Sequence, residues 1–330
     1  MAETMRAARM LGVNEIVCEE AAVPDIGADE ILVHTSMASI CGSDLHVVCH
    51  GAGIGHELPC PHGYPGHEGI GEVVASNHDR VAVGTRVLCF PVPGADVGFA
   101  EYQRMNGNFV LPLPQSDLPE SNLLMAQQLG TVIFAARQRP RDVTGETVVV
   151  LGQGSAGLFW AYVMKRSGAA RVIVADKSDS RLAVSESFGA DITINAGESD
   201  TVEAVKDLTD GVGADYVIEA VGRRETLFQS IEVARVGGQM MWFGLPDSDD
   251  SVPISFSKFF RKKLMASSTY GAQVEGDAVS FQTALDWINA GEVDVSPLLS
   301  HVYPIEEISH AFDVANEPTE EGALKVSVTF

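Results

Sequence analysis

The chain has 330 residues, 45% hydrophobic and 20% charged, a balance typical of a globular protein with two domains. Its formal net charge of −23 argues against binding to nucleic acid or to an anionic membrane, because both repel an acidic surface. No segment is apolar over the roughly 18 residues that a membrane-spanning helix needs.

The N-terminal segment is charged throughout and lacks the apolar stretch of a signal peptide. The five cysteines are odd in number and have no regular framework, which favours a reducing, cytoplasmic setting. The excess of 45 acidic over 22 basic residues has two interpretations. It either keeps the protein soluble or adapts it to high salt, where ions screen the repulsion within an acidic shell.

Before Leu123 the sequence favours short strands. Residues 30–37, 70–75 and 86–90 have strand composition and are separated by glycine and proline. No long amphipathic helix is indicated among them. This part of the chain is therefore expected to be an all-β unit.

A stretch rich in cysteine and histidine, residues 41–69, lies between the first two of these strands. It contains three of the five cysteines and five of the nine histidines. Five of these side chains lack the paired spacing of a structural zinc site: Cys49, His50, His56, Cys60 and His62. They lie on one loop, for which contacts to substrate, a second metal site and no chemical role are the alternatives.

From Leu123 the pattern changes to helices alternating with strands. Residues 123–138 have helical spacing, and the apolar segments 148–151, 171–176, 215–222 and 239–246 are separated by helical stretches. This alternation predicts a parallel sheet. A helix over 277–291, the segment 302–316 and a final strand over 323–330 complete the chain.

A glycine-rich turn joins the strand 148–151 to the following helix, and reads Gly152-Gln153-Gly154-Ser155-Ala156-Gly157. Its first glycine permits the tight turn, its second lets the backbone approach a pyrophosphate, and its third lets the helix pack on the strand. The start of the helix offers free N–H groups to phosphate. The alternative is a tight turn in an unrelated parallel sheet.

An acidic residue, Asp176, ends the next strand, 19 residues after Gly157. A carboxylate there accepts hydrogen bonds from the adenosine ribose and would repel a 2′-phosphate. The sequence therefore favours NAD over NADP, although Lys177 or Arg181 could each accommodate a phosphate.

Several of these motifs together resemble the zinc-dependent medium-chain alcohol and polyol dehydrogenases, such as the sorbitol, threonine and glucose dehydrogenases. They are Cys41-Gly-Ser-Asp-Leu-His46, Gly66-His67-Glu68 with Gly69 and Gly71-Glu72, and the glycine turn. GFAEYQR, LGTVIFAAR, DGVGADYVIEAVG and the closing strand follow in the family's order, so the resemblance covers essentially the whole chain.

The resemblance implies an α/β protein with two domains. A GroES-like, β-rich catalytic domain would span 1–127 and 272–330, and a doubly wound Rossmann domain that binds NAD would span 128–271. Zinc would lie in the cleft between them. A homodimer or homotetramer is implied as well.

The same resemblance implies roles for individual residues. Cys41 and His67 would bind the metal, and Glu68 would bind it directly or through water. Ser43 would take the proton of the alcohol and His46 would pass it on. The residues implied to contact the cofactor further along the chain are Thr131, Ala220, Val221, Gly222, Ser268, Thr269 and Tyr270.

The sequence departs from many family members at two places. Gln127 stands where many members have a Cys or Glu that supplies a further ligand, and some sugar dehydrogenases of the family resemble the pattern with Gln. Either the amide of Gln127 binds the metal or water does. The segment 92–97 stands where many members carry four cysteines for a structural zinc, and it contains none. One zinc per chain is therefore expected.

The sequence predicts an NAD-dependent zinc dehydrogenase acting on a small polar alcohol, polyol or sugar. Two rivals are a zinc-independent enoyl or quinone reductase of the same superfamily and a non-catalytic protein that binds NAD. The first usually lacks residues like Cys41, His67 and Glu68. The pairing of Ser43 with His46 argues against the second.

Overall fold

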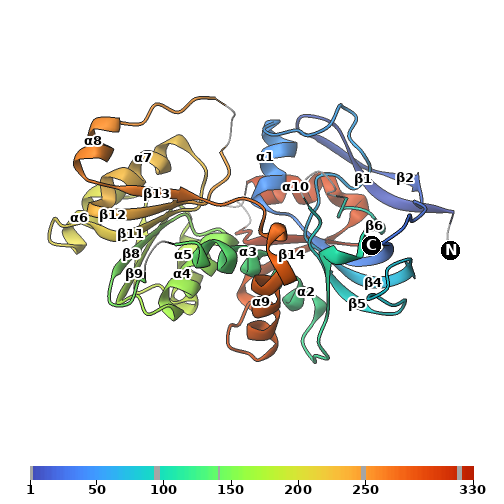
Figure 1. Cartoon of the computed structure of the whole chain (residues 1–330). Helices are drawn as coiled ribbons and strands as arrows, with labels where there is room; N and C mark the ends of the chain where they lie inside the picture. The colour runs from blue at the N-terminus through green and yellow to red at the C-terminus, as the bar shows by residue number, and fades with distance from the viewer. Residues whose placement is uncertain (1–2, 93–96, 140–141, 247–249, 318–321) are drawn as a thin grey trace. The chain divides into compact units, whose positions relative to one another are not determined.

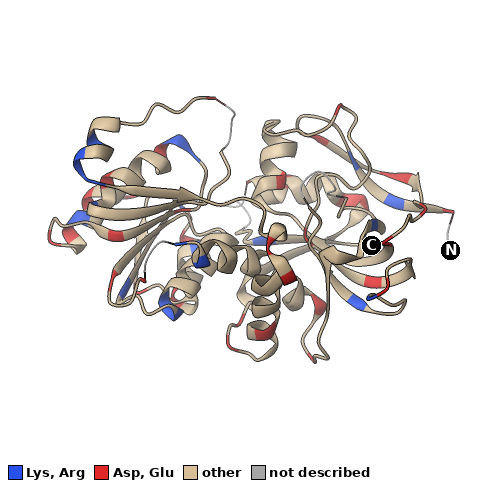
Figure 2. Ribbon diagram, viewed as in Figure 1, with Lys and Arg blue, Asp and Glu red and all other residues tan. Residues whose placement is uncertain are grey.

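The computed structural model describes residues 3–92, 97–139, 142–246, 250–317 and 322–330 (Figure 1). The chain divides into two compact units, one of Met1–Thr131 with Gly271–Phe330 and the other of Val132–Tyr270. The boundaries expected from the sequence lie four residues and one residue away from these. Acidic side chains occur on elements of both units (Figure 2).

The second unit contains the parallel sheet that the sequence predicts. Its strand order is β10-β9-β8-β11-β12-β13 among the described residues, and every neighbouring pair is parallel, as in a doubly wound fold. The strands are β8 (Thr147–Leu151), β9 (Arg171–Asp176), β10 (Ile192–Asn195), β11 (Ala214–Glu219), β12 (Ala234–Trp242) and β13 (Met265–Ser268). The helices are α4 (Ser155–Arg166), α5 (Asp179–Ser185), α6 (Thr201–Leu208), α7 (Arg224–Val233) and α8 (Phe256–Arg261).

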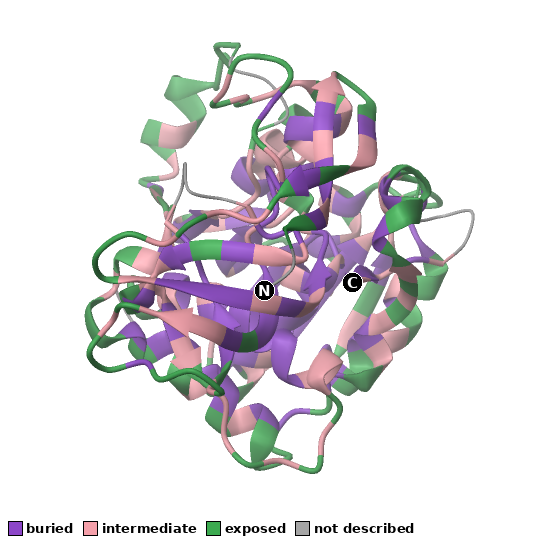
Figure 3. Ribbon diagram, turned by 90° about the vertical axis from the view of Figure 1, so that its right-hand side faces the viewer, coloured by how far each residue is buried: buried purple, intermediate pink, exposed green. Residues whose placement is uncertain are grey.

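The first unit is β-rich. A seven-stranded sheet has the order β14-β15-β3-β4-β5-β7, with β6 paired to β3, and β1 and β2 form a separate hairpin among the described residues. The strands are β1 (Thr4–Gly12), β2 (Glu15–Ala22), β3 (Glu30–Ser39), β4 (Gly69–Ser76), β5 (Arg86–Cys89), β6 (Tyr102–Asn106), β7 (Val110–Pro112), β14 (Leu299–Pro304) and β15 (Lys325–Thr329). Purple segments in Figure 3 mark the buried residues of these strands.

Helices in and around the first unit differ from the expected pattern. The expectation of an all-β region before Leu123 is wrong at α1 (Gly42–His50), whose first turn is held by Asp44, since its Oδ2 accepts a hydrogen bond from the Cys41 N–H at 2.8 Å. The single helix expected from residue 123 is two, α2 (Glu120–Leu124) and α3 (Ala126–Arg137). The others are α9 (Val279–Asn289) and α10 (Ile308–Asn316).

The chain ends inside the sheet of the first unit. Strand β15 pairs with β14 on one side and antiparallel with β3 on the other, with Ser327 opposite Ser39. The first residues of β15 therefore lie at the carboxyl end of β3, which leads into Cys41. In the described ranges, no helix is both long and apolar enough to cross a membrane.

Candidate functional site

A cluster of three potential metal ligands lies in the first unit. Cys41 follows β3, and His67 and Glu68 directly precede β4. One ligand atom from each lies within 4.8 Å of the other two, and no other such group of three occurs among the described residues. A thiolate, an imidazole and a carboxylate form a donor set that binds zinc and leaves a coordination position open.

Asp44, for which no role was predicted from the sequence, orients two of these ligands. Its side chain is buried; Oδ2 accepts from the Cys41 N–H at 2.8 Å, and Oδ1 lies 3.0 Å from Nδ1 of His67. A carboxylate on Nδ1 leaves Nε2 for a metal and raises the basicity of the ring. Burial would lower the pKa of His67, but the charge of Asp44 raises it well above the usual value.

Glu68 divides its two oxygens between different partners. Oε2 lies 2.6 Å from Nζ of Lys325 and accepts a hydrogen bond from the Ser39 hydroxyl. Burial would raise the pKa of Glu68, but Lys325 and His67 lower it, so the carboxylate stays ionised. Oε1 is buried and has no hydrogen-bond partner among the described atoms. An unpartnered carboxylate oxygen beside Cys41 and His67 fits a bound cation.

Two further predicted residues contact His67, and a third contacts one of these two. The Ser43 hydroxyl is 3.4 Å from Nε2 of His67. Gln127 is buried, and its amide nitrogen is 3.4 Å from the backbone carbonyl of His67, which leaves its amide oxygen as the atom that a metal would take. The Thr131 hydroxyl donates to the carbonyl of Gln127 at 3.1 Å. His46 lies on α1, and its ring centroid is 5.9 Å from that of His50.

The loop between the two ligand segments makes mainly structural contacts. Cys60 is fully buried, and Nε2 of His62 lies 2.7 Å from a carboxylate oxygen of Glu19. His56 packs edge-to-face on Tyr64 with ring centroids 4.7 Å apart. Burial raises the pKa of Cys49, a half-buried residue of α1, to about 11. These contacts anchor the loop to the hairpin β1–β2 and to its own residues.

The glycine turn of the second unit leaves space where a dinucleotide phosphate would approach. A Cβ on Gly157 would lie 1.9 Å from the carbonyl oxygen of Gly152, so only glycine fits there. A Cβ on Gly154 would meet nothing closer than Nη1 of Arg181, at 4.0 Å. Gly154 precedes α4, so the open space lies at the helix N-terminus, where Ser155 and Ala156 begin the first turn.

Asp176 is held at the end of β9 by two backbone amides. Its Oδ2 accepts from the Gln153 N–H at 2.6 Å and its Oδ1 from the Ser178 N–H at 2.9 Å. Nη1 of Arg181 lies 4.0 Å from Oδ2, and Lys177 is exposed. The carboxylate is therefore fixed beside the glycine turn with a cation close to it.

The remaining residues predicted to contact the cofactor follow two other strands of the sheet. Ala220, Val221 and Gly222 come directly after β11, and Ser268 ends β13 with Thr269 and Tyr270 behind it. Because all the strands are parallel, these residues lie at the same edge of the sheet as the glycine turn. Tyr270 is largely exposed.

Two buried charged residues besides Asp44 were missed from the sequence. Lys325, fully buried in β15, is a lysine within the apolar run ALKVSVTF, and Glu219 ends the apolar strand DYVIE. A charge inside an otherwise apolar strand is the signal that could have found both, because a buried charge needs a specific partner.

Comparison with known proteins identifies both parts of the chain. Residues 27–115 match the model of the alcohol dehydrogenase GroES-like domain, and residues 156–290 match that of the zinc-binding dehydrogenases. The chain is 29% identical to a sorbitol dehydrogenase of Bacillus subtilis, with 99% of this chain and 97% of that protein aligned. An L-threonine 3-dehydrogenase of the same organism is 27% identical over 90% of this chain and 91% of its own. A chain from Sinorhizobium meliloti solved with bound NADP has the same fold, with a TM-score of 0.84, 24% identity and complete coverage of both chains.

Proposed function

Because the chain belongs to the zinc-type medium-chain alcohol and polyol dehydrogenases, and is thus an oxidoreductase acting on CH–OH groups, we propose that it oxidises a small polar alcohol, polyol or sugar with zinc and NAD. The observation that carries the proposal is the group of Cys41, His67 and the buried Glu68, with an oxygen of Glu68 left unpartnered. The open glycine turn beside Asp176 supports the choice of cofactor.

The proposed reaction divides its work among residues of known position. A zinc ion held by Cys41, His67 and Glu68 would polarise the hydroxyl of the alcohol and lower its pKa. The Ser43 hydroxyl would accept the alcohol proton as its own proton passes on to His46. A nicotinamide cofactor held at the glycine turn and Asp176 would supply the acceptor for the hydride that leaves the alcohol carbon as the carbonyl group forms. Asp44 holds Cys41 and His67 in place throughout.

Metal removal tests this function against its rivals. We expect one zinc per chain by elemental analysis, and we expect a strong chelator to abolish NAD reduction with a panel of polyols and sugars until zinc is restored. A zinc-independent enoyl or quinone reductase would keep its activity after chelation. A non-catalytic protein would bind NADH and turn over none of the alcohols.

Gln127 is proposed as a further ligand or near-ligand through its amide oxygen. Its amide nitrogen bonds to His67, so the side chain is already held beside a ligand residue. The Gln127→Ala variant is expected to bind zinc about 10- to 100-fold more weakly, the range for a residue next to a metal. Gln128→Ala is the matched control, because Gln128 is the neighbouring buried glutamine. Equal zinc affinity in the two variants would reject the role of Gln127.

NAD is proposed over NADP because Asp176 would oppose a 2′-phosphate at the end of β9. The nearby Arg181 and the fold relative solved with NADP make the opposite preference worth measuring. Asp176→Asn keeps the shape and acceptor oxygen of the side chain but removes its charge. We expect the ratio of kcat/KM for NAD to that for NADP to fall about tenfold or more, roughly the 1.4 kcal/mol of one lost charge repulsion. An unchanged ratio would contradict the assignment.

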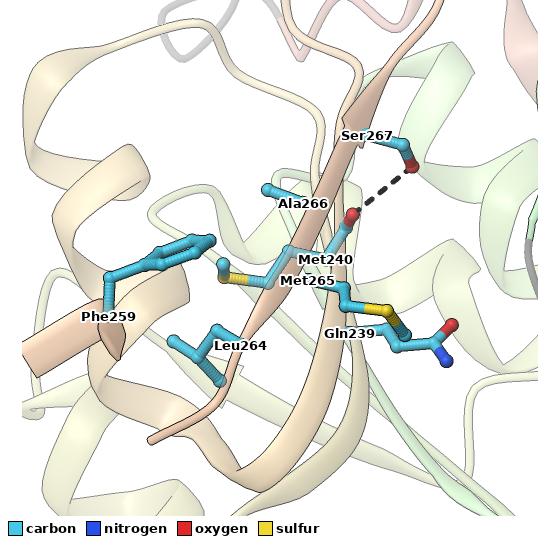
Figure 4. Close-up of a pocket in the computed structure, with 7 residues that line it drawn as sticks. All are labelled: Gln239, Met240, Phe259, Leu264, Met265, Ala266 and Ser267. Atoms are coloured by element: carbon cyan, nitrogen blue, oxygen red, sulfur yellow. Dashed lines mark hydrogen bonds between the residues drawn. The ribbon is translucent and has the colours of Figure 1, made fainter. Parts of the chain in front are cut away.

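We propose that the chain self-associates through β13, the outermost strand on one side of the parallel sheet. Strand β13 ends the sheet order, and six of the fourteen large apolar side chains exposed in the described residues lie within 252–270: Val252, Ile254, Phe256, Phe260, Met265 and Tyr270. A cavity of about 390 Å³, lined by residues such as Phe259 and Met265, opens beside this strand (Figure 4). Analytical ultracentrifugation should show a dimer or tetramer. The double variant Phe256→Ser with Phe260→Ser should have a higher dissociation constant for this oligomer.

A cytoplasmic location is proposed from the redox state of the cysteines. All five are free thiols in the structure, and thiols persist in a reducing compartment.

A further inference from the structure

Glu219 is a buried acidic residue at the carboxyl end of β11, and only 1% of it is exposed. One of its oxygens, Oε1, accepts three hydrogen bonds. The donors are the backbone N–H of Val221 at 2.9 Å, the N–H of Gly222 at 3.0 Å and the Thr226 hydroxyl at 2.7 Å. A single carboxylate therefore joins the loop after β11 to the first turn of α7, to which Thr226 belongs.

The loop that Glu219 holds, residues 220–222, is packed between two other loops. A Cβ on Gly152, in the glycine turn, would lie 2.6 Å from a methyl group of Val221. On the other side, a Cβ on Gly222 would lie 1.9 Å from the carbonyl oxygen of Leu245, and one on Gly244 2.1 Å from the Gly222 nitrogen. The three loops at this edge of the sheet are therefore in contact, and the middle one has little room to shift.

The backbone of Glu219 belongs to the same network. Its carbonyl accepts from the N–H groups of Phe243 and Gly244, both at 2.9 Å, and the next N–H, of Ala220, donates to the carbonyl of Leu151 at 2.9 Å. The carboxyl ends of β8, β11 and β12 are thus joined by backbone hydrogen bonds at Glu219 and Ala220.

The carboxylate of Glu219 is stabilised by donors of the loop and of α7. Burial raises the pKa of Glu219, and the three hydrogen bonds from Thr226, Gly222 and Val221 oppose that rise; none of the described lysines and arginines contributes. Removing the side chain would therefore leave two loop N–H groups without their acceptor, and a buried N–H without a partner is costly. The loop would be expected to change its conformation.

We propose that Glu219 is a positioning residue for the nicotinamide cofactor, which fixes the backbone of residues 220–222 in the conformation that contacts a bound dinucleotide. The inference rests on the proposed function, because it assumes that this edge of the sheet binds NAD. Glu219 itself touches no cofactor atom in this account. It acts through the loop, so its loss should weaken cofactor binding more than it slows hydride transfer.

The experiment measures NADH binding to the zinc-loaded protein by fluorescence titration, together with KM for NAD and kcat. Glu219→Ala is expected to raise the Kd for NADH and the KM for NAD about tenfold or more, with kcat changed less than threefold. Glu219→Gln keeps an acceptor oxygen and should recover most of the affinity. Thr226→Val removes one of the three donors, and we expect an increase in Kd of about threefold.

Ser230→Ala is the matched control for a merely structural effect. Ser230 is buried on the same helix, α7, where its hydroxyl donates to the Leu227 carbonyl and accepts from the indole N–H of Trp242; neither partner belongs to the loop 220–222. This variant should lower the melting temperature but leave the Kd for NADH unchanged.

The outcomes distinguish a failure of the proposed function from a failure of the role proposed for Glu219. If the wild-type protein does not bind NADH, the proposed function fails. If it binds, and Glu219→Ala binds as tightly as Ser230→Ala, the inference is overturned. Should Glu219→Ala fail to fold, the comparison passes to Glu219→Gln and Thr226→Val: looser binding by Thr226→Val alone supports the role of Glu219, and wild-type binding by Thr226→Val rejects it.

Discussion

The metal cluster of the first unit consists of charged side chains, whereas the glycine-rich sheet edge of the second unit consists mainly of backbone. At the metal cluster, side chains carry the chemistry, and charged groups are buried in contact with one another: Asp44 with His67, and Glu68 with Lys325. At the sheet edge, the backbone is the binding surface, and glycines such as Gly154 keep it accessible. Buried carboxylates there, such as Glu219, bind backbone N–H groups.

This difference predicts how each region fails. Removing one partner of a buried ion pair lowers the free energy of unfolding by several kcal/mol. Changes at the metal cluster should therefore affect folding and metal affinity together. A backbone surface is blocked by added atoms, so changes at the sheet edge can remove binding while the fold persists.

The largest effect is expected from Cys41→Ser. The variant replaces a thiolate by a hydroxyl that binds zinc poorly, so zinc content should fall and kcat/KM should drop about 10³-fold, equivalent to the several kcal/mol that a Lewis acid contributes. Elemental analysis and NAD reduction measure the two quantities. Cys18→Ser, at a half-buried cysteine outside the cluster, should retain both. Full zinc content in Cys41→Ser would remove Cys41 from the ligand set.

The next largest effect is expected at the buried ion pair. Lys325→Met leaves the carboxylate of Glu68 buried without its cation, and the free energy of unfolding should fall by about 3–5 kcal/mol. Adding Glu68→Gln to Lys325→Met removes the stranded charge as well. The double variant should therefore lose less stability than the sum of the two single variants, as urea unfolding of the zinc-free proteins would show.

The contribution of this pair should also depend on pH. Lys325 and His67 overcome the effect of burial and lower the pKa of Glu68, so its stabilisation is present above the unfolded value of about 4.3 and is lost as pH falls through the folded pKa. Burial would lower the pKa of Lys325, but Glu68 raises it, so that stabilisation is lost only as pH rises past about 10.4. Without Lys325, burial raises the pKa of Glu68, so the stability difference between wild type and Lys325→Met should grow as pH rises from about 4.3 toward neutral and persist up to about 10.4. A difference that disappears at pH 7 would contradict the assignment.

A smaller effect is expected from two alanines placed in the glycine turn. Gly154→Ala adds a Cβ to open space at a φ of −65°, so the free protein should keep its stability while NADH binding weakens about tenfold or more, because the methyl group occupies the approach of the phosphates. Gly157→Ala forces a Cβ against the Gly152 carbonyl and should cost about 1–3 kcal/mol of stability. Melting curves and NADH titrations separate the two. If Gly154→Ala bound NADH normally, the turn would not be the phosphate site.

The sequence predicted those parts of both regions that lie close together along the chain. The glycine turn, Asp176 and the parallel sheet were predictable because each follows from local spacing or from the alternation of strands and helices. The cluster partners Ser39 and Lys325 were not, because Lys325 lies 257 positions after Glu68 along the chain, and the two meet only when β15 inserts beside β3. Helix α1 was missed for a related reason: its first turn depends on Asp44, whose second oxygen binds His67 from a later segment.

The smallest effect is expected at an exposed counterpart of the buried pair. Lys165, on α4 of the second unit, lies 2.6 Å from Asp191, as close as Lys325 lies to Glu68, but its side chain is 39% exposed against 1% for Lys325. Ions screen exposed pairs and barely reach buried ones. Lys165→Met should therefore cost about 0.2–1 kcal/mol in dilute buffer and nothing measurable in molar salt.

The same substitution at Lys325 should cost as much in molar salt as in dilute buffer, since the pair it breaks is out of reach of ions. Urea unfolding of both variants at the two salt concentrations gives the comparison. If the stability cost of Lys325→Met also vanished in salt, the pair of Lys325 and Glu68 would be solvated. The metal cluster would then not differ from the sheet edge by having buried charges in contact. A wild-type melting temperature that fails to rise with added salt would argue against the salt-adapted interpretation of the −23 charge, because ions should relieve the repulsion within such a surface.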